Sequence, residues 1–206
     1  MTTKVLNLYA GIGGNRKLWT DVDVTAVEWD ETRAKIYADH HPNDELVVAD
    51  AHEYLLENHD GFDFIWTSPP CPTHSKMRRL HPHADDVYPD MKLYQEILHL
   101  KHSFDGDWVV ENVNPYYQPL IEGVLRGRHL FWSNFHIPEI EIEAQGVKRN
   151  GGATIEQLES KFGFDTSGYG LDQRKRRKTL NNCVHPRLGK HVFESRTKQT
   201  ELPGVR

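Results

Sequence analysis

Short apolar segments recur along the chain, and most of them are followed by a stretch with helical patterning. Strand-length apolar runs lie at residues 5–9, 22–28, 46–50, 62–67 and 108–112, and helical patterns lie at 30–40, 51–58 and 91–102. This alternation is typical of βαβ units, in which consecutive strands run parallel and helices cover the sheet. We therefore expect an α/β fold with a mostly parallel, doubly wound sheet.

The second half of the chain is patterned less regularly. Residues 116–125 predict a further helix, residues 129–135 a sixth strand, and residues 186–195 a closing helix. Residues 72–88 carry prolines and little apolar periodicity, which indicates a long loop, and loops of that length in compact domains usually have a function. Residues 136–180 are weakly patterned. The length of 206 residues fits one domain with at most a small appendage.

Charge is distributed unevenly along the chain. Residues 1–70 carry 5 Lys and Arg against 13 Asp and Glu, a net charge of −8, whereas residues 168–206 carry 10 against 3, a net charge of +7. The last part would attract a polyanion such as nucleic acid, although a solvated basic tail explains the charge equally well.

Several classes of protein are excluded by composition. No apolar run reaches the roughly 18 residues of a membrane span, and no signal-peptide stretch opens the chain, so we expect a cytoplasmic protein. Two cysteines exclude a disulfide scaffold and a four-thiolate zinc site. His40 and His41, and the loop residues His74, His81 and His83, lack a second ligand cluster, so we expect no metal.

A glycine-rich turn follows the first expected strand. Gly11, Gly13 and Gly14 stand between that strand and an expected helix, where glycines allow a ligand to approach the backbone. Glu28 ends the second strand and Asp50 the third, at the sheet edge where ligands of open parallel sheets bind. A tight structural turn would explain the glycines alone; together with the carboxylates they favour a nucleoside-type cofactor.

Cys71 follows the fourth strand within Pro69-Pro70-Cys71-Pro72. A cysteine on a stiff, projecting backbone at the carboxyl edge suits a thiolate nucleophile if its pKa is depressed. The alternative is a small buried hydrophobic residue, which we consider more fitting for Cys183.

The fifth strand and the entrance to the sixth bring further charged groups. Glu111 lies where an apolar pocket would raise its pKa and allow proton donation near neutral pH, unless it is a solvent-facing partner in a salt bridge. Arg126 and Arg128 alternate on an expected strand, which points both guanidinium groups to one face. Otherwise such arginines are surface charges.

In chain order, these segments resemble the motifs of the cytosine-5 DNA methyltransferase family. The matching segments are residues 8–14, 28–30, Pro70-Cys71 with Ser75, residues 111–113, Arg126 with Arg128, and residues 181–184. The resemblance extends over essentially the whole chain. Pro72, Val124 and Asn181 depart from the residues common in the family, and the region usually occupied by a large target-recognition domain is reduced to residues 136–180.

The resemblance implies a Rossmann-like methyltransferase fold with S-adenosylmethionine as cofactor. The implied cofactor-binding residues are Tyr9, Ala10, Gly11, Gly13, Gly14, Glu28, Trp29, Asp50, Ala51, Pro69 and Asn182. The implied catalytic residues are Cys71, Glu111, Arg126 and Arg128. Cys71 would add to C6 of a flipped-out cytosine, Glu111 would protonate N3, and the arginines would bind O2 and hold Glu111.

The resemblance also predicts the partners and the division of the chain. The implied DNA contacts are Ser75, Lys76, Arg78, Arg79, Arg174, Arg176 and Arg177. Residues 1–135 would form the catalytic core, 136–180 a reduced target-recognition region, and 181–206 a segment completing the cofactor site. So small a recognition region predicts a short target sequence or a partner protein that supplies specificity.

Three other functions remain open from the sequence. The same chemistry could act on RNA such as a tRNA loop, where a large duplex-reading domain is unnecessary. The chain could be a catalytically silent relative that binds nucleic acid, although the retained Cys71, Glu111 and Arg128 argue against this. It could modify a free pyrimidine nucleotide, for which the basic run Arg174-Lys175-Arg176-Arg177-Lys178 has no obvious role. The family setting suggests a restriction-modification or phage system.

Overall fold

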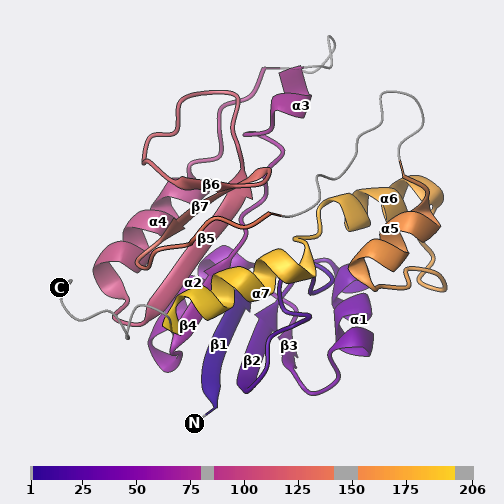
Figure 1. Cartoon of the computed structure of the whole chain (residues 1–206), viewed down its shortest axis with the longest axis horizontal. Helices are drawn as coiled ribbons and strands as arrows, with labels where there is room; N and C mark the ends of the chain where they lie inside the picture. The colour runs from indigo at the N-terminus through magenta and orange to yellow at the C-terminus, as the bar shows by residue number, and fades with distance from the viewer. Residues whose placement is uncertain (1, 80–85, 142–152, 198–206) are drawn as a thin grey trace.

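The computed structural model describes residues 2–79, 86–141 and 153–197. The strands in this part of the chain are β1 (Thr3–Leu8), β2 (Val22–Val27), β3 (Glu45–Val47), β4 (Phe64–Thr67), β5 (Asp107–Val113), β6 (Val124–Arg126) and β7 (His129–Ser133). They form one sheet in the order β3-β2-β1-β4-β5-β7-β6 (Figure 1). β1 to β5 run parallel to one another, and β7 pairs antiparallel with both β5 and β6. The expected mostly parallel sheet is confirmed.

Helices cover both faces of this sheet. The helical elements are α1 (Glu31–His40), α2 (Ala51–Asn58), the 3₁₀ turn η1 (His59–Gly61), α3 (Lys76–Arg79), α4 (Lys92–Ser103), α5 (Ile155–Phe162), α6 (Gln173–Asn181) and α7 (Pro186–Ser195). α2 and α4 cover one face, where Leu55 and Ile97 pack against strand residues such as Ile65. α7 crosses the opposite face, where Val192 packs with Trp66 (Figure 1).

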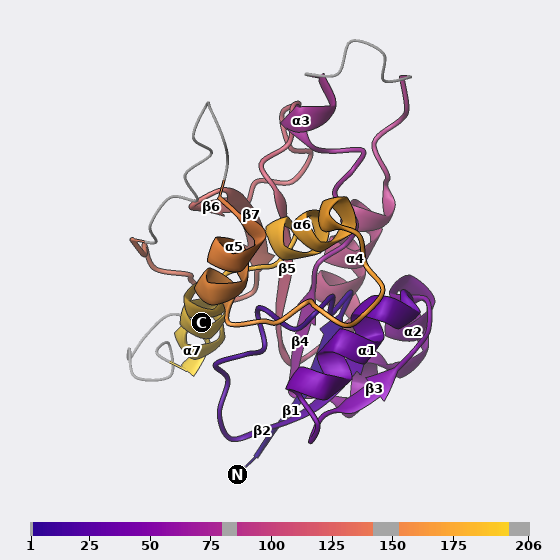
Figure 2. The same cartoon turned by 90° about the vertical axis from the view of Figure 1, so that its right-hand side faces the viewer.

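A third apolar cluster lies at the β3 side of the molecule. α5 and α6 lie side by side next to α1, as the two views show (Figures 1 and 2). Leu158 and Phe162 of α5 and Leu180 of α6 share this cluster with Ile36 of α1 and with Ile12, which lies within the glycine turn. Residues 153–180 are therefore packed against α1 and the glycine turn.

One expected element near the end of the sheet is wrong. Residues 116–125 do not form a helix: residues 124–126 form the edge strand β6, paired with β7. The indole Nε1 of Trp132 donates a hydrogen bond to the carbonyl of Ile121, and a Cβ on Gly123 would lie 2.8 Å from the carbonyl oxygen of Phe131. The end of this segment therefore pairs with β7, and strand pairing replaces the local helix that the apolar spacing suggested.

Two connections also differ from expectation. Residues 9–21, between β1 and β2, form turns and no helix. α7 fits so closely against this segment that a Cβ on Gly189 would lie 2.2 Å from the carbonyl oxygen of Asn15. The expected loop at residues 72–88 contains the short helix α3, which projects beyond the carboxyl edge of the sheet (Figures 1 and 2).

The remaining expected boundaries hold approximately or closely. β3 is shorter than expected and begins earlier, because Asp50 caps α2 through the amides of His52 and Glu53. α7 begins and ends at the expected residues. Across residues 2–79, 86–141 and 153–197, no helix is both long and apolar enough to cross a membrane.

Candidate active site at the carboxyl edge of the sheet

Cys71 lies in the loop that leaves β4, and β5 fixes this loop in place. The side-chain amide of Asn112 donates a 2.9 Å hydrogen bond to the carbonyl of Pro69. Beyond the cysteine, the backbone amides of His74 and Ser75 both donate to the carbonyl of Cys71 at 3.0 Å. The loop is thus held on both sides of a half-buried cysteine. Sequence analysis did not single out Asn112 for this role.

Glu111 is buried on β5 and pairs with His129 of β7. The two side chains share one face of the sheet, because Glu111 lies opposite Phe131, two residues from His129. His129 Nδ1 is 2.5 Å from Glu111 Oε1, and the hydroxyl of Ser68 also hydrogen-bonds this carboxylate. Burial alone would raise the pKa of Glu111, but its contact with His129 outweighs burial and holds that pKa below its ordinary value.

This result corrects the electrostatic expectation for Glu111. The apolar pocket was expected to raise its pKa and keep a proton on the carboxyl near neutral pH. The structure instead gives Glu111 a hydrogen-bonded carboxylate, because His129 compensates for burial. The residue that changes the outcome follows Arg128 directly in sequence. Nothing in the apolar strand pattern around it indicated a partner for Glu111.

Arg126 and Arg128 do not share a face, so this expectation is wrong. Arg126 ends β6, and the turn at Gly127, with φ of 60°, separates it from Arg128. The Arg126 guanidinium donates to the carbonyls of Ile137 and Pro138. Arg128 Nε donates to His129 Nε2 at 3.2 Å, and its Nη2 donates to the carbonyl of Asn181 at 2.5 Å.

Cys71, Glu111 and Arg128 form one electrostatic group. The pKa of the Cys71 thiol is raised, first by burial and then by the negative charge of Glu111, while Arg128 and Lys178 act in the opposite direction. The cysteine therefore carries its proton at neutral pH, contrary to the depressed pKa that a resting thiolate requires. Lys178, near the end of α6, was identified from sequence only as part of a basic run.

The glycine turn contains glycines of two kinds. At Gly11, with φ of 59°, an added Cβ would meet only the carbonyl oxygen of Tyr9, at 4.0 Å, so the backbone is open to a ligand. At Gly13 a Cβ would lie 2.3 Å from His41 Nε2, and at Gly14 it would lie 2.0 Å from the Cys183 sulfur. The latter two glycines allow the turn to pack against the protein itself, and only Gly11 offers the close approach that we expected of all three.

The residues around Gly11 fit the adenosine part of S-adenosylmethionine. Glu28 Oε2 accepts from the amide of Gly11 and Oε1 from the amide of Asp30, both at 2.9 Å. Because Oε1 also pairs with Arg33 at 3.1 Å, acceptor capacity for a ribose hydroxyl remains on Oε2. The indole of Trp29 is 65% exposed, and the side chain of Asp50 is exposed at the start of α2. An aromatic face, a carboxylate oxygen with remaining acceptor capacity and an open glycine are groups that suit a nucleoside.

Other residues expected at the cofactor lie nearby but contribute differently. Ala10, Ala51 and Pro69 are buried, and Asn182 is the exposed C-cap of α6. Ala10 fixes the turn to β2 through a 3.0 Å hydrogen bond from its amide to the carbonyl of Val27. Direct cofactor contact by these four residues stays a prediction.

A buried carboxylate beneath the turn was missed by sequence analysis. Glu96 of α4 is 1% exposed and accepts hydrogen bonds from the hydroxyls of Tyr9 and Thr67, both at 2.6 Å. His52 Nδ1 lies 2.9 Å from the same side chain. Tyr9 has φ of 53°, an unusual backbone conformation for a residue other than glycine. A glutamate in an apolar helix was the available signal, but its partners could not be read from spacing.

The predicted DNA-contacting residues fall into two groups. Ser75 and Lys76 lie at the start of α3, where Ser75 Oγ accepts from the amide of Met77; the side chains of Arg78 and Arg79 lie outside the described part of the chain, as do His81 and His83. On α6, Arg174 and Arg177 are exposed. Arg176 instead forms a 2.7 Å ion pair with Glu159 of α5, so it stabilises the helix pair. A contact between any of these residues and DNA stays a prediction.

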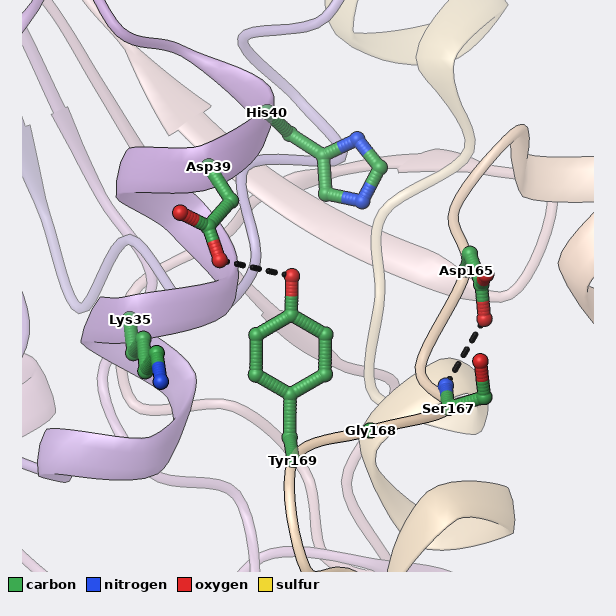
Figure 3. Close-up of a pocket in the computed structure, with 7 residues that line it drawn as sticks. All are labelled: Lys35, Asp39, His40, Asp165, Ser167, Gly168 and Tyr169. Carbon is green, nitrogen blue, oxygen red and sulfur yellow. Dashed lines mark hydrogen bonds between the residues drawn. The ribbon is translucent and has the colours of Figure 1, made fainter.

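A polar groove of about 410 Å³ lies away from this group. Figure 3 shows Tyr169 donating a hydrogen bond to Asp39 at 2.8 Å, with His40 and Lys35 on the same helix. Asp165, Ser167 and Gly168 complete the lining. No residue predicted for catalysis, cofactor binding or DNA contact lines this groove.

Comparisons with known proteins also identify methyltransferases. A family model described as C-5 cytosine-specific DNA methylase matches residues 3–116, more than half of the chain. The methyltransferase EhMeth of Entamoeba histolytica aligns with a TM-score of 0.59 at 12% identity, covering 98% of this chain and 100% of that one. No match was found among curated proteins.

Two further structures align over part of the chain. DNMT2 of Spodoptera frugiperda, a mutant form, has a TM-score of 0.37 at 24% identity, covering 54% of this chain and 36% of that one. A putative DNA modification methyltransferase from an Escherichia coli prophage has a TM-score of 0.39 at 22% identity, covering 57% and 34%. Of these three alignments, that with EhMeth is close enough to show a shared fold, which is that of a methyltransferase.

Proposed function

Because the chain belongs to the C-5 cytosine-specific DNA methylase family, we propose that it transfers a methyl group from S-adenosylmethionine to C5 of cytosine in DNA. The observation that carries this proposal is the convergence of Cys71, Glu111 and Arg128. They come from three separate segments, and the charges of Glu111 and Arg128 both act on the Cys71 thiol. A silent relative has no need for such an arrangement.

The cofactor site supports the same reaction. S-adenosylmethionine, when bound, supplies an electrophilic methyl group. Glu28 would accept the ribose hydroxyls, Trp29 would stack on the adenine, and Gly11 would allow the methionine part close to the backbone. Because the loop after β4 leaves the same edge of the sheet as this turn, Cys71 would face a cytosine placed between the two.

The proton of Cys71 determines how the first step proceeds. The resting cysteine is a thiol and the resting Glu111 is a carboxylate, so Glu111 is the base that accepts the thiol proton. The sulfur then bonds to C6, the electrons of the C5–C6 double bond move through C4 to N3, and Glu111 returns its proton to N3. Arg128 stabilises the charge during this transfer. C5 thereby becomes nucleophilic toward the methyl group.

Completion of the reaction restores the enzyme. After methyl transfer, a base removes the C5 proton, the C5–C6 double bond forms again as the C6–S bond breaks, and the N3 proton returns through Glu111 to the Cys71 sulfur. The cytosine cannot reach these groups within a stacked duplex, so it must be flipped out or already single-stranded. α3 projects beyond this edge of the sheet (Figure 2).

We also propose that the isolated chain reads a short sequence or relies on a partner protein. Within residues 136–180, the described part from 153 onward buries Ile155, Leu158 and Phe162 against the catalytic core. These side chains therefore hold the region in place and are not available to DNA. Exposed groups on α6, such as Arg174, fit phosphates without reading bases.

The test is methyl transfer from radiolabelled S-adenosylmethionine to three substrates: mixed-sequence duplex DNA, transcribed tRNA, and free deoxycytidine nucleotide. We expect label in DNA, at C5 of cytosine by bisulfite sequencing, and a covalent complex on DNA containing 5-fluorocytosine. The Cys71→Ala variant should give neither product. Label in tRNA alone would establish the RNA alternative, and label in no substrate would contradict the proposed activity.

A further inference from the structure

The side chains of Arg128, His129 and Glu111 form a continuous hydrogen-bonded chain that ends beside Cys71. Arg128 Nε lies 3.2 Å from His129 Nε2, and His129 Nδ1 lies 2.5 Å from Glu111 Oε1. The histidine and the glutamate are both buried, at 6% exposure each. Of these three residues, only His129 lies outside the motifs that sequence analysis identified.

The hydrogen-bond partners of His129 determine which of its ring nitrogens carries the proton. Arginine has only N–H donors, so His129 Nε2 must accept from Arg128 and carries no proton. The single proton of a neutral imidazole is then on Nδ1, which donates it to the Glu111 carboxylate. A proton on Nε2 as well would direct two donors toward each other in a buried place. Arg128 thus selects the tautomer that hydrogen-bonds to Glu111.

The surroundings show why Glu111 depends on this bond. Ser68 and Cys71 act on Glu111 or interact with it from the loop after β4, and Arg128 does so from the turn before β7. Lys178 of α6 also acts on Cys71, and Cys183 acts on Arg128. His129 makes the largest contribution that favours the carboxylate form over burial. The remaining groups are Ser68, a neutral donor, and Arg128.

We propose that His129 is a positioning residue that keeps Glu111 an oriented carboxylate, ready to take the proton of the Cys71 thiol. This inference rests on the proposed function, because it gives Glu111 its base role in the first step. His129 does not touch the substrate; it acts through Glu111. During the addition of Cys71 to C6, the S–H bond breaks, the S–C6 bond forms, and the thiol proton moves through Glu111 to N3.

The first experiment does not depend on methyl transfer. The protein is labelled with ¹³C at glutamate carboxyl groups and ¹⁵N at histidine rings, and the Glu111 signal is assigned with the Glu111→Gln variant. In the wild type we expect the His129 proton on Nδ1 and a Glu111 midpoint below the ordinary glutamate value. His129→Phe keeps a ring of similar size but removes the donor, so the midpoint of Glu111 should move to higher pH.

The second experiment measures kcat against pH on the DNA substrate, with active sites counted by covalent trapping on 5-fluorocytosine DNA. In His129→Phe the acidic limb should move to higher pH, and kcat at neutral pH should fall about 10-fold or more, since general acid–base catalysis contributes roughly 10²–10⁴-fold. His129→Asn places an amide donor near the position of Nδ1 and should recover part of the loss. His136→Gln, an exposed histidine after β7, is the matched control and should behave as wild type.

The outcomes separate this inference from the proposed function. An unchanged Glu111 midpoint and an unchanged acidic limb in a folded His129→Phe protein would overturn the role of His129. If the wild type methylates no substrate but the Glu111 midpoint is still higher in His129→Phe than in the wild type, the proposed function is overturned and the electrostatic role of His129 is supported. Equal losses in His129→Phe and His129→Asn, with no change of pH profile, would indicate a packing role and contradict the proposal.

Discussion

Replacement of Glu96 by alanine tests whether a single buried carboxylate holds the cofactor turn. In the variant, the hydroxyls of Tyr9 and Thr67 lose their acceptor, and Thr67 is fully buried. Each hydrogen bond to a charged acceptor contributes about 1.5–3 kcal/mol, which gives about 3–6 kcal/mol for the two. Removal of a buried charge returns part of this, because burying the carboxylate is itself costly.

We therefore expect the Glu96→Ala protein to lose about 3 kcal/mol of unfolding free energy. For a domain of this size, that corresponds to a decrease in Tm of about 6–12 °C. Glu96→Gln keeps one acceptor oxygen and should lose less, about 1–2 kcal/mol. Tyr9 holds a left-handed backbone conformation beside Gly11, so loosening its side chain should also weaken S-adenosylmethionine binding.

The assay combines urea unfolding with calorimetric titration of S-adenosylmethionine. A double-mutant cycle with Tyr9→Phe isolates the shared hydrogen bond, because the phenylalanine removes the hydroxyl that Glu96→Ala leaves unsatisfied. The double variant should be more stable than the sum of the single effects predicts, by about 1 kcal/mol. Additive effects, or a loss below about 0.5 kcal/mol in Glu96→Ala, would refute the role assigned to this carboxylate.

Three further predictions concern pH, packing and charge. The hydrogen bond to Glu96 raises the pKa of His52 above its ordinary 6.5. The stability that this pair supplies is therefore present below pH 6.5 and is lost as pH rises through the raised pKa. Urea unfolding at stepped pH should show this loss, and His52→Asn should flatten the dependence of the unfolding free energy on pH. Gly189→Ala forces a methyl against the Asn15 backbone and should destabilise by about 1–3 kcal/mol in thermal melts, whereas Gly61→Ala meets no atom within 4 Å and should change little. Arg174→Gln should reduce the salt dependence of DNA binding by up to about 0.9 in the slope of log K against log salt for one lost phosphate contact; an unchanged slope would exclude such a contact.

Local sequence patterns predicted the elements whose stability depends on nearby residues. α7 begins where expected because Pro186 opens it, and it extends as far as expected because its apolar spacing is regular. Cys71 was placed correctly at the end of β4 because an apolar run followed by prolines can only be a strand that stops. The segment at residues 116–125 failed because its backbone finds partners in β7, which a local pattern does not contain.

The amino-acid sequence by itself determined the α/β class, the order of the motifs and the sheet edge at which they meet, since these follow from periodicity and from the parallel arrangement of strands. Only the tertiary structure decided the charge states and partners within the site. His129 lies 18 residues from Glu111, and Tyr9 lies 87 residues from Glu96. Such pairs form when the strand order brings distant segments together, and burial then makes each hydrogen bond decisive for the charge of its acceptor.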